Sequence, residues 1–202
     1  MFIILWMNEQ QRKPDRRASR TKTAIRKHLV SLILEKHYDL ITVQDIIERA
    51  DVGRSTFYLH FRDKEDVLFS DWKRFLEFFF KHVSWENLQQ GQLLPVRELF
   101  HHLKEYYGFY RALERSQKSE RLFRTGQRYL EESFERELIS RFDADSVSVP
   151  LRVSATYLAR EIFGQMRWWL DASMPNSPDD MDRIFHELVM PGLRNSLNVN
   201  SN

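Results

Sequence analysis

The stretch that decides the fold of the N-terminal region runs from Ile41 to Leu68 and reads ITVQDIIERADVGRSTFYLHFRDKEDVL. Thr42 precedes a run with helical apolar spacing, and Asp45 follows it three residues later. A threonine N-cap with an acidic residue at the third helical position resembles a capping box. The pattern predicts a helix that begins after Thr42 and ends near Ala50.

A tight turn is expected at Asp51–Gly53, because Asp tolerates a left-handed backbone and Gly53 can cap the next helix. A short second helix should run from Arg54 to about Phe61, and Asp63 can cap a longer one that starts at Lys64. Small or apolar residues at the elbow would hold the two short helices at a fixed angle. The expected packing residues are Ile46, Ile47, Ala50, Val52, Phe57 and Phe61.

This segment resembles the DNA-binding domain of the TetR/AcrR family, and the resemblance covers about residues 20–70. It rests on Thr42-Val43, Ile46, Ala50, Val52, Thr56-Phe57-Tyr58-x-His60-Phe61 and Lys64-Glu65-x-x-Leu68. The chain departs from the family pattern at Asp51, where Gly is frequent, and at Gly53, where Ser is frequent. A third departure is His37, which stands where Gly is usual at the end of the first helix.

The resemblance implies a DNA-binding surface in which the second short helix enters the major groove. Arg54, with Ser55 and Thr56, should reach base edges or nearby phosphates, and a bidentate contact to guanine suits the guanidinium group of Arg54. The other members should bind phosphate oxygens, with Lys64 helped by the helix dipole. The whole set is Thr42, Arg54, Ser55, Thr56, Tyr58, His60 and Lys64.

Outside this segment, apolar residues recur with helical spacing and no β-type alternation of useful length is present. We therefore expect an all-α protein of about nine helices. The resemblance implies a three-helix helix-turn-helix domain followed by a helical ligand-binding and dimerisation domain. The other expected helices cover about residues 20–36, 64–85, 95–106, 120–142, 151–172 and 178–196. Gly108 suggests a break after the third of these, before a short segment through Leu113. The expected divisions are a basic arm at 1–19, the DNA-binding domain at 20–66, the regulatory domain at 67–197 and a tail at 198–202.

Charge is unevenly distributed along the chain. Residues 8–64 hold 13 Lys or Arg against 8 Asp or Glu, whereas residues 65–202 hold 18 against 21. A basic N-terminal portion suits phosphate binding.

The absence of Cys excludes disulfides and thiolate chemistry and fits a cytoplasmic setting. The apolar run from Met1 to Met7 is too short to span a bilayer, and Met7 is an alternative start.

No enzyme motif is visible, since a Gly-rich phosphate loop, GxSxG and HExxH are all missing. His101 and His102, with Glu98 and Glu105, could be drawn as a metal cluster. Adjacent histidines point in different directions on a helix, and no second cluster closes the site. We therefore predict no catalytic residue, metal or cofactor.

The C-terminal half offers two sets of aromatic and apolar candidates. Those for a ligand pocket are Phe79, Phe100, Tyr106, Tyr110, Phe123 and Tyr129. Those for a dimer interface are Phe163, Trp168, Trp169, Phe185 and Leu188. Adjacent tryptophans cannot share one helix face, so one should face the core and the other a partner. The Trp-Trp-Leu run and the Met-Pro-Gly-Leu near the end are similar to one large bacterial subgroup of these regulators, which includes a coactivator of dihydroxyacetone-kinase genes.

The resemblance therefore implies a homodimeric repressor that binds a palindromic operator and is released by a small apolar or aromatic effector. The first alternative is a TetR-like coactivator that acts through a partner protein. The second is a helical enzyme or ligand carrier, which no motif supports.

Overall fold

A computed structural model describes residues 16–116 and 118–199 of the 202-residue chain. Most of the expected basic arm, and the question of Met1 or Met7 as the start, lie outside these residues. The described part contains nine α-helices, so the expected all-α architecture is confirmed. None of the described helices combines the length and the apolar character needed to cross a membrane.

The described chain divides into two compact units. The first comprises residues up to Phe75 together with Gly108–Leu122, and the second comprises Leu76–Tyr107 and residues from Phe123 onward. The expected boundary at residues 66 and 67 therefore does not coincide with the division in the structure, because the segment 108–122 packs with the N-terminal helices.

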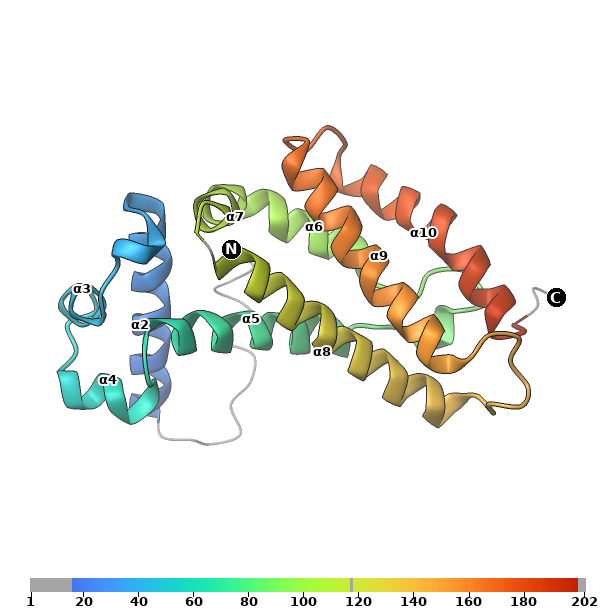
Figure 1. Cartoon of the computed structure of the whole chain (residues 1–202), viewed down its shortest axis with the longest axis horizontal. Helices are drawn as coiled ribbons and strands as arrows, with labels where there is room; N and C mark the ends of the chain where they lie inside the picture. Colours follow the sequence, from blue (N-terminus) through green and yellow to red (C-terminus); the bar gives the residue numbers. More distant parts are fainter. Residues whose placement is uncertain (1–15, 117, 200–202) are drawn as a thin grey trace. The chain divides into compact units, whose positions relative to one another are not determined.

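The first unit begins with α2 (Arg16–Glu35), which starts four residues earlier than the sequence indicated. A 3-10 turn η1 (Tyr38–Leu40), α3 (Val43–Arg49) and α4 (Arg54–His60) follow (Figure 1). The unit also contains α5 (Lys64–Lys81) as far as Phe75, and nearly all of α7 (Tyr107–Glu114). Its core is formed by side chains of the predicted packing set and of α2. The buried residues include Ile25, Leu29, Leu32, Ile33, Ile46, Ile47, Phe57 and Phe61.

The second unit contains α6 (Val96–Glu105), most of α8 (Lys118–Arg141), α9 (Leu151–Asp171) and α10 (Pro178–Ser196). A second 3-10 turn, η2 (Trp85–Asn87), lies between α5 and α6. Helices α9 and α10 lie side by side (Figure 1) and pack on α6, where the Phe100 and Trp169 rings meet edge to face at 5.0 Å. The expected break at Gly108 falls instead at Tyr106, and Gly108 lies within α7.

Candidate nucleic-acid interface

The entry to α3 is fixed by the predicted capping box. The hydroxyl oxygen of Thr42 accepts a hydrogen bond from the Asp45 backbone N–H at 3.1 Å, and the Asp45 carboxylate accepts from the Thr42 N–H at 2.6 Å. The Nζ atom of Lys36 lies 2.9 Å from the same carboxylate. This lysine, followed by the Thr42 donors, holds the pKa of Asp45 well below its usual range. The start of α3 is therefore tied to the end of α2.

The turn between α3 and α4 adopts the backbone that the sequence predicted. Asp51 has a positive φ of 50°, and the Val52 N–H donates to the Ile47 carbonyl at 3.0 Å. Gly53 is the N-cap of α4 and is in an extended conformation. A left-handed residue followed by an extended one reverses the chain within three residues, so α4 begins directly after α3 ends.

Helix α4 has a buried face and an exposed face. Phe57 and the C-cap residue Phe61 are buried, and their rings lie 6.0 Å apart. Thr56 and His60 are half-buried at the border of the core. The exposed residues of α4 are Arg54, Ser55, Tyr58 and Leu59. Of the predicted base-reading residues, Arg54 and Ser55 are thus exposed on α4, and Thr56 lies beside them at the border of the core.

Arg54 is positioned by a polar chain on α3. Its Nη2 donates to the side-chain oxygen of Gln44 at 2.8 Å, and Gln44 Nε2 in turn donates to the Glu48 carboxylate at 2.6 Å. These bonds occupy one edge of the guanidinium group and leave its other donors to other partners. The side chain is therefore held in place without being buried.

Tyr58 and His60 are the two predicted phosphate ligands on α4. The Tyr58 ring is 49% exposed and rests edge-on against Phe57 at 5.4 Å between centroids. Burial, and then the nearby charge of Lys22, lower the pKa of His60. Lys22 lies on α2, so a cationic group of α2 lies close enough to influence His60 of α4.

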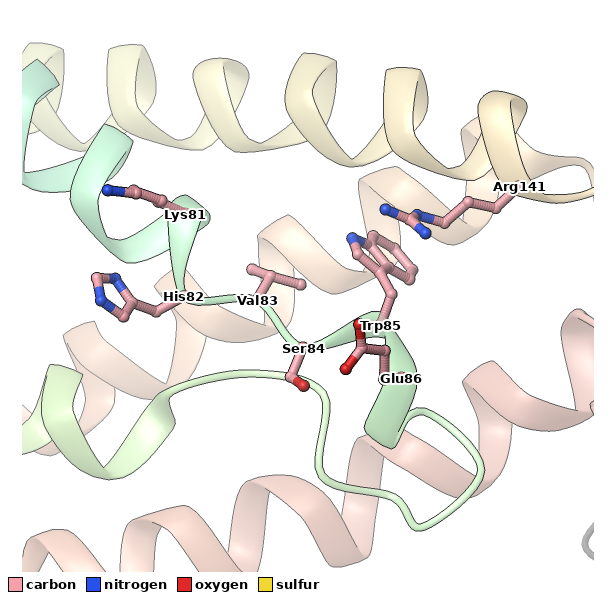
Figure 2. A pocket seen from close by; sticks show the side chains of 7 residues that line it. All are labelled: Lys81, His82, Val83, Ser84, Trp85, Glu86 and Arg141. Carbon is pink, nitrogen blue, oxygen red and sulfur yellow. The ribbon is translucent and has the colours of Figure 1, made fainter.

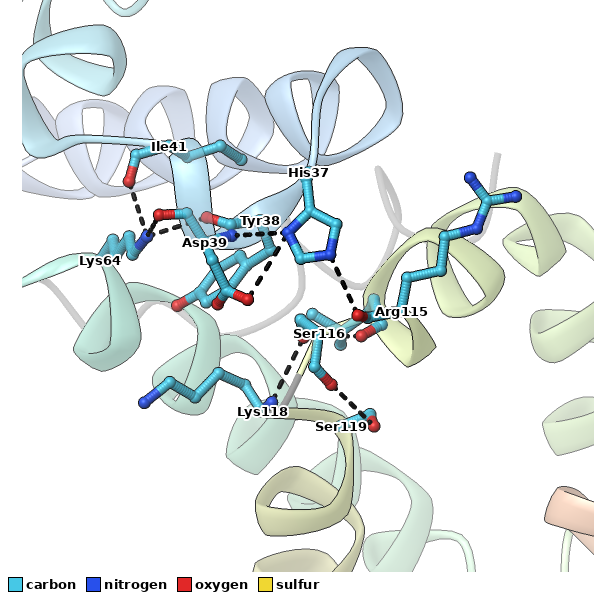
Figure 3. A network of polar contacts seen from close by, with 10 residues as sticks. His37, Tyr38, Asp39, Ile41, Lys64, Arg115, Ser116, Lys118 and Ser119 are labelled. Atoms are coloured by element: carbon cyan, nitrogen blue, oxygen red, sulfur yellow. Dashed lines mark hydrogen bonds and ion pairs between the residues drawn. The ribbon is translucent and has the colours of Figure 1, made fainter.

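Lys64 occupies a different place from the one its sequence position implied. Its Nζ donates to the backbone carbonyls of Tyr38, Asp39 and Ile41 at 2.8, 3.2 and 2.6 Å (Figure 3). It also lies 4.5 Å from the centre of the Tyr38 ring, and burial lowers its pKa. An ammonium group has three N–H donors, and all three have partners in this conformation. Lys64 therefore fastens η1 to the start of α5.

At His37, where glycine is usual in similar sequences, the side chain stabilises the turn between α2 and η1. Its backbone has a φ of −54°, so no left-handed residue is required there. The ring Nδ1 accepts from the Asp39 N–H at 3.3 Å, which leaves Nε2 to donate to the Arg115 carbonyl at 3.0 Å (Figure 3). The imidazole thus links η1 to the segment that follows α7, within the first unit.

One exposed residue of α4 was not in the predicted set. Leu59 is 78% exposed and lies four residues after Ser55. Residues four apart share a helix face, so this leucine lies on the same outward face as Ser55. Its helical spacing from Ser55 is visible in the sequence, whereas the resemblance points only to the hydrogen-bonding residues of that face.

The pocket candidates are spread through the second unit and the first. Phe79 and Phe100 are buried, Tyr110 packs edge-on against Trp72, and Tyr106, Phe123 and Tyr129 are half-buried. A hollow of about 310 Å³ lies at the end of α5 and is lined by none of them. Figure 2 shows the Arg141 guanidinium beside the Trp85 ring, and its Cζ atom lies 5.3 Å from the ring centre; both side chains line this hollow. Lys81, His82, Val83, Ser84 and Glu86 complete its lining.

The interface candidates separate into two groups. Trp169 is fully buried, whereas Trp168 is 52% exposed, so the two tryptophans face opposite ways as expected. Phe163 and Phe185 are also buried in the core of their own unit, and with Trp169 they cannot form an outer surface. The candidates that remain are Trp168 and Leu188. Exposed Val153, Tyr157 and Gly164 lie on α9 with Trp168, whereas Leu188 lies on α10.

Comparison with known proteins places this helix-turn-helix chain in a family. Residues 25–70 match the model of bacterial regulatory proteins of the tetR family, and residues 93–191 match a transcriptional regulator C-terminal region. The chain belongs to the TetR family of transcriptional regulators.

Several relatives are similar to the chain. An uncharacterized HTH-type transcriptional regulator of Bacillus subtilis, YxbF, is 38% identical over 61 residues, which span 30% of this chain but only 16% of that protein. A TetR-family regulator from Syntrophomonas wolfei superposes with a TM-score of 0.67 at 20% identity, covering 89% of this chain and 98% of the other. A TetR regulator from Streptococcus agalactiae has a TM-score of 0.58 at 25% identity, covering 87% and 96%.

Proposed function

We propose that the chain acts as a homodimer that binds a palindromic operator and represses transcription until an apolar or aromatic effector releases it. Each α4 enters a major groove, and the half-sites lie one helical turn, about 34–36 Å, or a small multiple of it apart. Arg54, Ser55 and Thr56 read base edges. Tyr58 and His60 donate to phosphates, and Thr42, the N-cap of α3, is a further phosphate ligand.

The observation that carries the proposal is the division of α4 into a buried aromatic face and an exposed polar face. Phe57 and Phe61 anchor the helix, while Arg54, Ser55 and Tyr58 are exposed. A helix of this kind is rigid before it meets a ligand, which suits a groove-reading element. Lys64 is left out of the proposed contacts, because its donors are engaged with carbonyl groups.

Dimerisation through α9 and α10 is supported by an exposed stripe on these helices. Val153, Tyr157, Gly164 and Trp168 recur with spacings of four and seven, which places them on one side of α9. Leu188 is 68% exposed on α10, the neighbour of α9. Apolar side chains gathered on a helix pair suit two-fold contact with an identical pair.

The effector site is proposed for the second unit, where aromatic side chains lie between core and surface. Tyr106, Phe123 and Tyr129 are half-buried there, and Phe123 packs against Phe163 at 6.0 Å. Apolar walls with a few polar tips are typical of small-molecule sites. An aromatic probe such as anilinonaphthalene sulfonate should fluoresce when added and should weaken DNA binding if the two sites are coupled.

The test of DNA binding is a selection from random duplexes, followed by affinity measurement on the selected sequence and on DNA from the protein's own upstream region. The double variant Arg54→Ala/Tyr58→Ala should lose more than 100-fold in affinity, whereas Arg128→Ala on α8 should not. If no duplex is selected, operator binding is overturned, and the coactivator that acts through a partner protein becomes the better reading.

The test of dimerisation is light scattering on Trp168→Glu/Leu188→Glu. This variant should be monomeric and should lose affinity for a full palindrome, because buried charges oppose the apolar contact. Ile139→Glu changes an equally exposed apolar residue on α8 and should remain dimeric. A dimeric Trp168→Glu/Leu188→Glu variant would assign the interface elsewhere.

A further inference from the structure

Leu59 is the most exposed of the large apolar side chains that the structure describes, at 78%. Single exposed leucines are common on protein surfaces and need no function. This one lies on the helix whose exposed face otherwise carries polar groups. The position of Leu59 on this face of α4 is therefore more informative than its exposure alone.

The surroundings of Leu59 are polar and cationic. Ser55 precedes it by one helical turn, and the exposed Arg54 and Tyr58 belong to the same seven-residue helix. Arg62 is exposed just beyond the C-cap and pairs with Asp66 at 3.2 Å. Leu59 is thus an apolar spot within a surface that suits a polyanion. A protein partner would be expected to place acidic side chains against the cationic residues around Leu59. A DNA duplex instead places phosphates on either side of an open groove, which leaves the groove itself for Leu59.

The floor of the major groove contains one apolar group, the 5-methyl group of thymine. The other base edges there present hydrogen-bond donors and acceptors, which a leucine would desolvate without satisfying them. A leucine pointing into the groove therefore favours thymine over the other bases by contact with its methyl group.

We propose that Leu59 is a specificity-determining residue that selects thymine at one position of each half-site through its 5-methyl group. This inference rests on the proposed binding of α4 in the major groove. It adds an apolar contact to the hydrogen-bonding residues of the same face, and it makes deoxyuridine, which lacks only that methyl group, a direct probe.

The expected size follows from the burial of one methyl group. Replacing the critical thymine by deoxyuridine should weaken binding about fourfold in one half-site, and about 15-fold when both symmetry-related thymines are replaced. Other thymines of the operator should show no such loss. In Leu59→Ala the ratio of the two dissociation constants should fall to about one. This variant should fold, because an exposed leucine contributes little to packing and Ala favours helices.

The experiment uses the full chain and a duplex obtained by selection from random DNA, with single deoxyuridine substitutions scanned across a half-site. Leu40→Ala is the matched control, since Leu40 is 69% exposed in the same unit but lies on η1. That control should keep the thymine preference. Placing 5-methylcytosine, instead of cytosine, at the critical position should restore part of the affinity in the wild type and none in Leu59→Ala.

The outcomes separate this inference from the function on which it rests. Selected DNA that binds equally well with thymine or deoxyuridine at every position overturns the role of Leu59 and leaves operator binding intact. The same holds if Leu59→Ala keeps the preference. Failure to select any sequence overturns operator binding itself, and with it the thymine contact.

Discussion

The Nζ atom of Lys64 lies 2.8 Å from the carbonyl oxygen of Tyr38 and 4.5 Å from the centre of the same residue's ring. One cation therefore engages both the backbone and the aromatic face of η1. The Ile41 carbonyl, at 2.6 Å, completes the attachment just before the cap of α3. We call these contacts of Lys64 with Tyr38 and Ile41 the Lys64 clamp. The position of α3, and of α4 that follows it in the chain, depends on this clamp.

Replacing Lys64 with Met should lower the free energy of unfolding of the first unit by about 2–4 kcal/mol. The reason is that three carbonyl groups lose a charged donor in a partly buried place. Urea unfolding followed by circular dichroism measures the loss. Lys27→Met, at an exposed position on α2, should change stability by less than about 0.5 kcal/mol.

The dependence of DNA affinity on salt concentration distinguishes a structural role of Lys64 from a phosphate contact by the same residue. Each phosphate contact that is removed reduces the slope of log K against log salt by about one. In Lys64→Met we expect weaker binding with an unchanged slope. A reduced slope with normal stability would instead restore Lys64 to the phosphate-binding set.

The helix-turn-helix could be predicted in detail because its signals are local. The Thr42–Asp45 cap, the left-handed Asp51 and the alternation of buried Phe57 with exposed Tyr58 depend on residues a few positions apart. Such patterns follow from backbone preferences and helical spacing alone. They required no knowledge of what packs on the helices.

The rest of the site depends on contacts between distant segments, which spacing does not encode. Lys64 meets carbonyls 23 to 26 residues earlier, and His37 meets a carbonyl 78 residues later. Likewise, helical periodicity indicated that Trp168 and Trp169 diverge, but Phe163 and Phe185 could be assigned to the core only when α6, α9 and α10 were seen together.

Thr42→Ala should cost about 1 kcal/mol of stability, as the loss of an N-cap usually does. It should also weaken DNA binding, because α3 supports α4 and the hydroxyl lies at the proposed phosphate contact. Thermal unfolding and DNA titration on the same samples measure both.

A matched control exists at the start of α10. Ser177 and Asp180 form the same capping box, with the Ser177 hydroxyl 2.7 Å from the carboxylate. Ser177→Ala should lose similar stability and leave DNA affinity within twofold. Equal effects of both variants on DNA binding would mean that the loss at Thr42 reflects stability alone.

Arg54→Ala should relax the base preference at one position of each half-site, at a cost of about 1–3 kcal/mol for the preferred base. Gln44→Ala should show a weaker form of the same change, because it removes the 2.8 Å hydrogen bond that orients the guanidinium group. Selection on each variant, followed by sequencing, shows which position becomes degenerate. A uniform loss on every sequence would make Arg54 a phosphate ligand.

His60 should make DNA binding depend on pH. Its pKa in the free protein lies below the ordinary value of about 6.5, because burial and Lys22 disfavour the cation. A bound phosphate favours the cation, so binding takes up a proton and affinity should rise several-fold as pH falls from 8 to 6. His60→Gln should flatten this profile, and His82→Gln, at an exposed position of the second unit, should not.

The stability of the free protein should change with the opposite sign. Because the pKa of His60 is lower in the folded state than in the unfolded one, its contribution is fully present above about pH 6.5 and is lost as pH falls through the folded-state value. Acidification would therefore strengthen the complex while weakening the free fold. An affinity that falls with stability on acidification would contradict a phosphate contact by His60.

Gly164 tests the dimer interface from the side of α9. It is exposed, and a Cβ atom added there would meet nothing within 4 Å in the isolated chain. Gly164→Ala should therefore stabilise the helix by up to about 1 kcal/mol. Gly164→Leu should be tolerated by the monomer fold, yet raise the dimer dissociation constant at least tenfold if a partner helix approaches closely at this point.

Glu132→Leu puts the same side chain at an exposed position of α8 and should leave the dimer unchanged in sedimentation velocity. A Gly164→Leu dimer as tight as the wild type would show that the partner does not cover this part of α9, and Trp168 would then need another role.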